Sequence, residues 1–361
     1  MTANASELPK IPRRKLRSIL NDEEKTALAV DLLYVTDNDS GIERRKKGGK
    51  FIYLFNNKEI KDDEELLRIK HLVIPPAWGK VWICANKNGH LQATGVDTRN
   101  RKQYKYHPTW IAIRNNTKFF RMLDFGKTLP SIRKRLKKDL SATELNVNKV
   151  LALVVSLMEN TNIRIGNHFY EKEYGSFGLT TLKDKHVKIN GNNVNFNFKG
   201  KKGVMHAISF KNKKLAKLIK QCRDIPGKEL FQYFDKDGNH HSIDSGMVNN
   251  YIHEISEETF TAKDFRTWSG TVLAFMALKE SGCCESEAET KHSIIAALDK
   301  VSSLLGNTRT VCKNYYVHPQ ILTLYQNKSL EKYFNVEVEQ SKIGEGLLPD
   351  EKAVMKILET T

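Results

Sequence analysis

The sequence predicts an α+β protein with a small, strand-rich N-terminal domain and a larger, mainly helical C-terminal domain that contains a small β-sheet. Three observations lead to this prediction. The N-terminal third alternates short aromatic and β-branched runs with turn residues, a pattern typical of strands and hairpins. Longer apolar runs with helical spacing follow, and strand-like segments interrupt them around residues 179–210. A chain of 361 residues is also long enough for two domains with separate cores.

We expect the chain to divide into three parts. Residues 1–22 form a basic leader, residues 23–116 the N-terminal domain and residues 117–361 the C-terminal domain. The polar stretch Arg114–Lys118 is the predicted linker between the two domains. The leader has no apolar stretch, so no secretion signal is expected.

The charge of the chain indicates a polyanionic partner. Lys and Arg number 59 and Asp and Glu 42, which gives a net charge of +17 at pH 7. An excess of this size favours nucleic acid as the partner. A basic, solvated surface with no specific partner is the alternative.

Several function classes lose support because their motifs are missing. The five cysteines include no CxxC pair, so neither a zinc site nor a disulfide framework is indicated, and a reducing intracellular setting fits best. No apolar run reaches the roughly 18 to 20 residues that span a bilayer. The sequence has no Walker loop, GxGxxG, HExxH or acidic metal cluster, which argues against nucleotide-driven and metal-dependent chemistry.

The N-terminal domain contains two predicted hairpins and a short helix. The first hairpin covers residues 51–60 and turns at Asn56-Asn57, and the second covers residues 81–94. Residues 62–69 are predicted to form a helix with acidic residues in its first turn, where their negative charge interacts favourably with the helix dipole.

Basic and aromatic residues interleave in the segment Arg101–His107. Arg101 can neutralise a phosphate, Gln103 can pair with a base edge, and Tyr104 and Tyr106 can pack on sugars or bases. If the segment is extended, the two tyrosines face one side and Gln103 the other. The alternative is a solvated basic strand with two core tyrosines.

The C-terminal domain begins with helical patterns. Residues 131–139 form a strongly basic helix face, which is either solvated or in contact with phosphates. Ser141–Glu144 fits a capping box that opens an apolar helix over residues 147–158. Arg164 follows this apolar segment, where an arginine is costly unless it is paired or meets an anion.

A strand-rich insertion and a further helix come next. The predicted strands cover residues 179–182, 186–189, 194–198 and 204–210. Lys201 lies at the tip of the turn Gly200–Gly203, from which a lysine can reach a ligand, although most turn lysines do nothing specific. A helix that begins at Thr261 places Arg266 one position away from its buried apolar stripe.

Residues 304–319 join two helices through a polar corner. An apolar helix ends at Gly306, and Asn307-Thr308 read as the cap of a second, short helix that carries Tyr315 and Tyr316. A tyrosine on such a helix is ordinarily part of the core, which is the alternative here.

Ten short motifs, in order along the chain, resemble those of type IB DNA topoisomerases of the compact kind found in bacteria and poxviruses. The motifs with Ile-Pro-Pro-Ala-Trp and Leu-Gly-Asn-Thr are typical of the bacterial members. The resemblance implies the catalytic core shared by tyrosine recombinases and type IB topoisomerases. The motifs are Gly41–Arg45, Ile74–Trp78, Gly95–Asp97, Arg101–His107, Asn162–Asn167, Gly178–Leu182, Phe198–Lys201, Lys263–Thr267, Leu305–Thr308 and Tyr316.

The resemblance also implies a role for each candidate catalytic residue. The family's nucleophilic tyrosine lies nine residues after the position of Asn307, which selects Tyr316 over Tyr315. Arg164, Arg266 and Asn307 align with the residues that stabilise phosphate oxygens, and Lys201 with the general acid. Poxvirus members have histidine at the position of Asn307; an amide can donate a hydrogen bond there but is no proton donor.

The implied reaction is relaxation of supercoiled duplex DNA. A strand is cleaved through a 3′-phosphotyrosyl intermediate, the duplex swivels, and the strand is religated without ATP. The resemblance implies double-stranded DNA as the partner, no required cofactor, no obligatory metal, a monomer, and a cytoplasmic, DNA-associated location. Arg101, Gln103, Tyr104 and Tyr106 are the implied DNA contacts of the N-terminal domain. A site-specific tyrosine recombinase and a non-catalytic DNA-binding relative are the rival interpretations.

Overall fold

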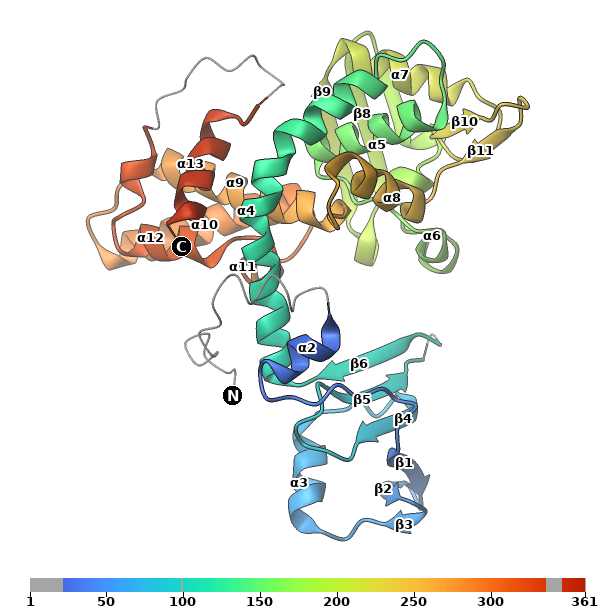
Figure 1. Cartoon of the computed structure of the whole chain (residues 1–361), viewed down its shortest axis with the longest axis vertical. Helices are drawn as coiled ribbons and strands as arrows, with labels where there is room; N and C mark the ends of the chain where they lie inside the picture. Colours follow the sequence, from blue (N-terminus) through green and yellow to red (C-terminus); the bar gives the residue numbers. More distant parts are fainter. Residues whose placement is uncertain (1–21, 99, 336–345, 361) are drawn as a thin grey trace. The chain divides into compact units, whose positions relative to one another are not determined.

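The computed structural model describes residues 22–98, 100–335 and 346–360. Almost all of the expected basic leader, residues 1–22, lies outside the described residues. The chain divides into two compact units, residues 1–118 and residues 119–361 (Figure 1). The strand-rich first unit and the mainly helical second unit confirm the predicted α+β class.

The prediction that Arg114–Lys118 forms a polar gap between two helices is wrong, because helix α4 runs without a break from Pro108 to Asp139. No glycine lies in this stretch and its nearest proline is Pro108, so nothing there stops a helix. The boundary between the two units falls inside this helix.

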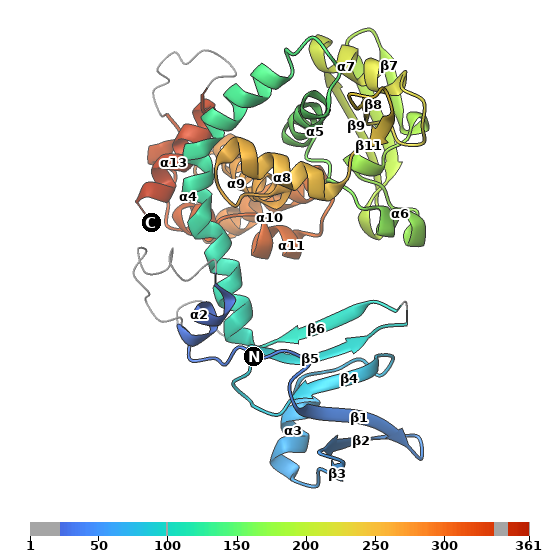
Figure 2. The same ribbon diagram turned by 45° about the vertical axis from the view of Figure 1, so that its right-hand side comes forward.

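The first unit is built on one antiparallel sheet of six strands. The strands follow the order β3-β2-β1-β4-β5-β6, which Figure 2 shows from bottom to top. Their bounds are β1 Gly41–Lys47, β2 Lys50–Phe55, β3 Lys58–Glu59, β4 Gly79–Cys84, β5 Leu91–Val96 and β6 Lys102–Tyr106. Two helices accompany the sheet, α2 Glu23–Leu28 and α3 Asp63–His71.

Both predicted hairpins of this unit are confirmed. Asn56 and Asn57 have φ values of 48° and 62°, and two left-handed residues are what the tight turn of a twisted hairpin needs. Asp62 caps α3 by accepting a hydrogen bond from the backbone N–H of Glu65 at 3.2 Å. The core beneath the sheet is small: Ile42, Ile69, Val81, Ile83 and Ala93.

The second unit packs helices around a three-stranded sheet and a short ribbon. The sheet has the order β7-β8-β9, and β10 pairs with β11. The strands are β7 Val187–Asn190, β8 Asn193–Lys199, β9 Met205–Lys211, β10 Gln232–Phe234 and β11 His240–Ser242. The helices after α4 are α5 Val147–Thr161, α6 His168–Tyr174, α7 Lys213–Arg223, α8 Ser245–Ser256, α9 Ala262–Ser281, α10 Glu287–Leu305, α11 Arg309–Tyr315, α12 Pro319–Gln326 and α13 Pro349–Glu359. Short 3-10 turns are η2 Leu179–Thr181, η3 Asp184–His186, η4 Lys201–Gly203 and η5 Glu331–Tyr333.

Helix α5 is the centre of the second unit. Almost every side chain along it is buried, and it contacts α7, α8 and α9 (Figure 1). A helix that is apolar all round belongs in the middle of a core rather than at its surface. Among the described residues, no helix is both long and apolar enough to cross a membrane.

Two local predictions in this unit are wrong. The capping box Ser141–Glu144 does not open α5, because the Ser141 hydroxyl donates back to the carbonyl of Lys137 at 2.7 Å. Asn146 is the cap and accepts from the backbone N–H of Lys149 at 3.0 Å. Residues 179–182 form no strand; they make the 3-10 turn η2, whose N–H groups bond to the loop that holds Arg164.

Candidate active site

Arg164 lies on the loop that leaves the buried helix α5. The helix ends at Asn162 in a left-handed conformation with φ 57°, which turns the chain sharply. The N–H of Leu179 in η2 then donates to the carbonyl of Arg164 at 2.9 Å. Gly178 allows this close approach, because a Cβ there would lie 2.5 Å from the Arg164 carbonyl oxygen. Two segments far apart in sequence therefore fix the backbone of this arginine.

Arg266 lies in the first turns of α9. The backbone N–H and hydroxyl of Thr261 donate to the Asp264 carboxylate at 2.8 and 2.9 Å, which fixes the start of the helix. Although charged, Arg266 is only 5% exposed. Its Nη2 donates to the carbonyl of Leu305 at 2.8 Å, and its Nη1 donates to the carbonyl of Asn162.

Asn307 contacts Arg164 at the corner between α10 and α11. Gly306 ends α10 with φ 58°, and its carbonyl accepts from Arg164 Nη2 at 3.1 Å. The same Nη2 atom donates to Oδ1 of Asn307. Thr308 is the helix cap of α11, which leaves the Asn307 side chain for the site. The Nδ2 group of Asn307 is buried and has no hydrogen-bond partner among the described residues.

Tyr316 is the residue directly after α11, so the expected short helix carries Tyr315 but ends before Tyr316. The ring of Tyr316 lies 5.3 Å from the guanidinium carbon of Arg266 and is half-buried, whereas Tyr315 is exposed. The buried hydroxyl of Thr271 donates to the Tyr316 carbonyl at 3.2 Å. Gly270 lets α9 approach, since a Cβ there would lie 2.7 Å from that carbonyl oxygen.

The site carries positive charge that nothing in it neutralises. Among the described residues, no carboxylate pairs with Arg164 or Arg266, and the buried Nε of Arg266 has no hydrogen-bond partner. Burial and the neighbouring Arg266 lower the pKa of Arg164 to about 10, and burial lowers the pKa of Arg266. One buried and one half-buried guanidinium and an unpaired amide donor beside a tyrosine can hold an anion with oxygen acceptors, such as a phosphate.

Lys201 lies at the tip of the β8–β9 hairpin, as predicted, and is exposed. It forms no hydrogen bond or ion pair with any residue that the structure describes, so the structure does not bring it into contact with Arg164 or Tyr316. The hairpin is nevertheless linked to the site through His206 on β9. A Cβ on Gly200 would lie 2.5 Å from the His206 ring, and a Cβ on Gly306 would lie 2.3 Å from it.

His206 was missed by the sequence interpretation. Its ring stacks on Phe198 with centroids 5.1 Å apart. Burial, together with the charges of Arg164 and Arg266, lowers the pKa of His206, so it is neutral near pH 7. No sequence signal singles it out, because a half-buried position on an alternating strand is an ordinary place for histidine.

One cluster in the described part of the chain has the side chains to hold a metal ion. Ligand atoms of His168, Glu171 and Glu229 lie within 4.8 Å of one another. Glu171 already pairs with Lys183 at 2.6 Å and with His168 at 3.2 Å. A metal ion would have to displace the lysine, and among the described residues the cluster forms no hydrogen bond or ion pair with the arginines of the site.

The predicted DNA contacts of the first unit lie on β6, at the edge of the six-stranded sheet. Tyr104 and Tyr106 are 48% and 39% exposed, and their rings stack 5.9 Å apart, so they are not core residues. Arg101 Nε and Gln103 Nε2 both donate to Oδ2 of Asp97, at 2.8 and 3.0 Å. These two side chains are thus anchored by a carboxylate, whereas the tyrosines present their rings to solvent.

Comparison with known proteins identifies the family. A sequence profile for the catalytic core of eukaryotic DNA topoisomerase I matches residues 105–342, and one for the N-terminal domain of bacterial DNA topoisomerase IB matches residues 50–97. The chain is 35% identical to DNA topoisomerase 1B of Acanthamoeba polyphaga mimivirus over 295 residues, which cover 80% of this chain and 88% of that one. It is 26% identical to DNA topoisomerase 1B of vaccinia virus (strain Copenhagen) over 242 residues, or 65% and 72% of the two chains. The chain therefore belongs to the type IB DNA topoisomerases.

Proposed function

We propose that this chain relaxes supercoiled duplex DNA through a 3′-phosphotyrosyl intermediate formed on Tyr316. One observation carries the proposal: the buried Arg266, the half-buried Arg164 and the Asn307 amide gather beside this tyrosine with no carboxylate paired to them among the described residues. Such a pocket suits a phosphodiester held in place for attack.

The reaction follows from these groups. Attack by the Tyr316 oxygen on phosphorus gives a pentacoordinate phosphorane with negative charge on two non-bridging oxygens. Arg164, Arg266 and Asn307 donate to those oxygens, in geometry fixed before the reaction begins. The P–O5′ bond breaks as the phosphorane collapses, which leaves the phosphorus bonded to the Tyr316 oxygen, and the phenol proton of Tyr316 passes to solvent water. Because bond energy is retained in the covalent link, the 5′-hydroxyl can reseal the strand by the reverse attack without ATP.

Lys201 is proposed as the general acid that protonates the leaving 5′-oxygen. An alkoxide is a poor leaving group and needs this proton. An exposed hairpin tip is suited to approaching the substrate, and the close approach of His206 to Gly200 and Gly306 keeps the turn end of the hairpin beside the residue that precedes Asn307.

Replacing Lys201 with alanine should slow cleavage by roughly 10²–10⁴-fold, the usual contribution of a general acid. A substrate with a 5′-bridging sulfur should restore the rate, because a thiolate leaves without a proton. Single-turnover cleavage of both substrates measures this, with Lys202→Ala on the same turn as the matched control. A Lys201→Ala defect that persists on the sulfur substrate would assign the proton to another group.

Duplex DNA is the proposed partner of both units, and the protein is proposed to act as a monomer. The net charge of +17 and the exposed Tyr104 and Tyr106 on β6 support a surface that meets phosphates, sugars and bases. We expect DNA affinity to fall steeply with salt, by about 10³-fold between roughly 50 and 200 mM, because phosphate neutralisation releases counterions. Fluorescence anisotropy over a salt series measures the slope, and a flat response would contradict this mode of binding.

We propose that the reaction needs no cofactor and no metal ion, and the decisive test is activity in the absence of both. Supercoiled plasmid without any recombination site should be relaxed by the protein alone, without ATP and in the presence of EDTA. A site-specific recombinase would leave such a plasmid supercoiled, and so would a non-catalytic relative. Mapping the trapped covalent adduct then identifies the attacking residue and the DNA end to which it is joined.

A further inference from the structure

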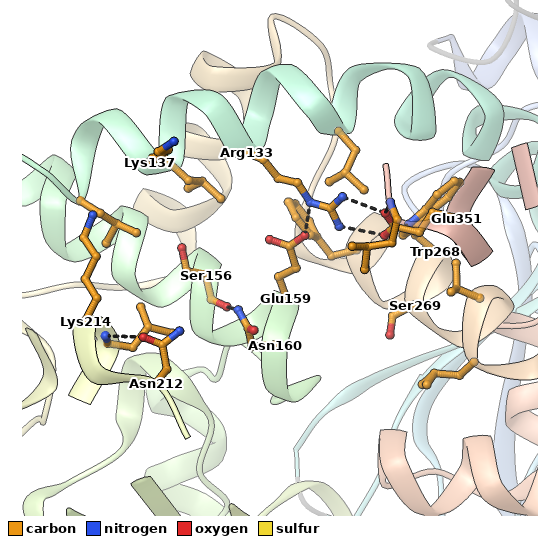
Figure 3. Close-up of a pocket in the computed structure, with 18 residues that line it drawn as sticks. Arg133, Lys137, Ser156, Glu159, Asn160, Asn212, Lys214, Trp268, Ser269 and Glu351 are labelled. Atoms are coloured by element: carbon orange, nitrogen blue, oxygen red, sulfur yellow. Dashed lines mark hydrogen bonds and ion pairs between the residues drawn. The ribbon is translucent and has the colours of Figure 1, made fainter. Parts of the chain in front are cut away.

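A buried polar network lies in a cavity of about 690 Å³ in the second unit. In Figure 3, Arg133 extends from α4 between two carboxylates, Glu159 on α5 and Glu351 on α13. Arg133 Nε lies 2.7 Å from Glu159 Oε1, and its Nη1 and Nη2 each lie 2.8 Å from a Glu351 oxygen. One guanidinium thereby joins three helices.

Glu351 is the most constrained member of this network. Its side chain is only 6% exposed. Besides the two bonds from Arg133, it accepts from Trp268 Nε1 at 3.0 Å and from the backbone N–H of Leu348 at 2.8 Å. Every partner that the described residues give this carboxylate is a donor, so both of its oxygens act as acceptors. Removing only one partner of such an ion pair strongly destabilises the folded protein, because it leaves the other charge buried without compensation.

The network is attached to both segments that carry the arginines of the site. Glu159 lies in the last turn of α5, three residues before Asn162, whose carbonyl accepts from Arg266. The Arg164 loop begins directly after that turn. Trp268 lies on α9, two residues after Arg266. Arg133 therefore holds the end of α5, while Glu351 holds the start of α9.

We propose that Glu351 and Arg133 are positioning residues for DNA cleavage: through them, the C-terminal helix α13 sets the spacing between the Arg164 loop and the first turns of α9. This inference rests on the proposed function of the site. It assigns a task to a helix that follows Tyr316 in the chain and contributes no side chain to the arginine cluster. Displacement of either arginine by a fraction of its hydrogen-bond length would weaken the contacts to the phosphate oxygens.

The test replaces Glu351 with glutamine. Glutamine keeps the shape of the side chain, but its NH₂ group faces hydrogen-bond donors and cannot accept from them. The expected result is a single-turnover cleavage rate lower by about tenfold to 10²-fold at nearly unchanged DNA affinity. Asp350→Asn is the matched control, because Asp350 ties the same helix to Lys279 at 3.0 Å outside the network. This control should cleave at the wild-type rate.

A double-variant cycle separates positioning from general loss of structure. If Glu351 acts through Arg266, then adding Glu351→Gln to Arg266→Ala should slow cleavage far less than Glu351→Gln alone slows the parent. Fully multiplicative effects would overturn the proposal, as would wild-type cleavage by a folded Glu351→Gln variant. If Glu351→Gln does not fold, Trp268→Phe removes only the indole N–H bond to Glu351 and is judged by the same rate and cycle.

The outcome can be told apart from failure of the proposed function itself. If the unaltered protein forms no covalent adduct with DNA, the proposed function fails. If it forms the adduct and Glu351→Gln forms it equally fast, only the positioning role is wrong.

Discussion

Replacing Tyr316 with phenylalanine will abolish both plasmid relaxation and the covalent protein–DNA adduct, while DNA affinity stays close to that of the unaltered protein. The ring remains, so its contact with the Arg266 guanidinium at 5.3 Å and the packing against α9 are kept. Only the attacking oxygen is lost. A denaturing gel that detects protein-linked DNA, together with a binding titration, measures the two effects separately.

Tyr315→Phe is the matched control for this substitution. Tyr315 ends α11 and is exposed, whereas Tyr316 turns into the site directly after the helix. The control should therefore relax DNA normally. Adduct formation by Tyr316→Phe would remove this residue as the nucleophile, and loss of the adduct in Tyr315→Phe instead would move the assignment by one position.

Replacing Arg266 with alanine should reduce the cleavage rate by roughly 10²–10³-fold, the usual effect of removing one donor from a preorganised oxyanion site. Arg266 is the most buried cation of the site, and its buried Nε has no hydrogen-bond partner among the described residues, so it can donate to a bound phosphate. Single-turnover cleavage at saturating protein isolates this effect from binding.

Arg266→Lys provides the sharper comparison for that prediction. A lysine keeps the charge but cannot donate in a fixed fork to both the Leu305 carbonyl and a phosphate oxygen. We expect it to remain well below the wild-type rate. If Arg266→Lys cleaves normally, charge alone suffices, and the geometric account of this arginine is wrong.

The sequence predicted those parts of the fold whose signals are local. Asn56-Asn57 supplies the two left-handed residues of a tight turn, α9 begins directly after Thr261, and Gly306 ends α10. Each of these depends on neighbours within a few residues, so the local chemistry suffices. The spacing between Asn307 and Tyr316 likewise lies within one corner of the chain.

One prediction failed because residues further along the chain decide the local conformation, and two failed because competing hydrogen bonds within a helix prevailed. Residues 179–182 have the composition of a strand, but their N–H groups bond to the carbonyls of Arg164 and Ile165 and are shaped by that loop. The sequence after Ser141 fits a capping box, yet the Ser141 hydroxyl donates a hydrogen bond to the carbonyl of Lys137 at the end of the preceding helix. Helical hydrogen bonding overrode the polar composition of Arg114–Lys118 in the same way.

The site was predicted in part for the same reason. The motifs identified Arg164, Arg266, Asn307 and Tyr316, and the structure brings these four residues together. His206 and Glu351 could not be found from the sequence, because their roles arise from contacts with distant residues. His206 lies against Gly306, 100 positions away, and Glu351 forms an ion pair with Arg133, 218 positions away. A strand histidine and a helix glutamate carry no signal of such partners.

The cluster of positive charge at Arg164 and Arg266 also bears on how this protein can evolve. Like charges buried without counter-ions work against the folded state, and a bound phosphate relieves their repulsion. An acidic substitution beside them would stabilise the free protein and at the same time occupy the place of the substrate. Selection for thermal stability alone should therefore enrich variants that are more robust and less active.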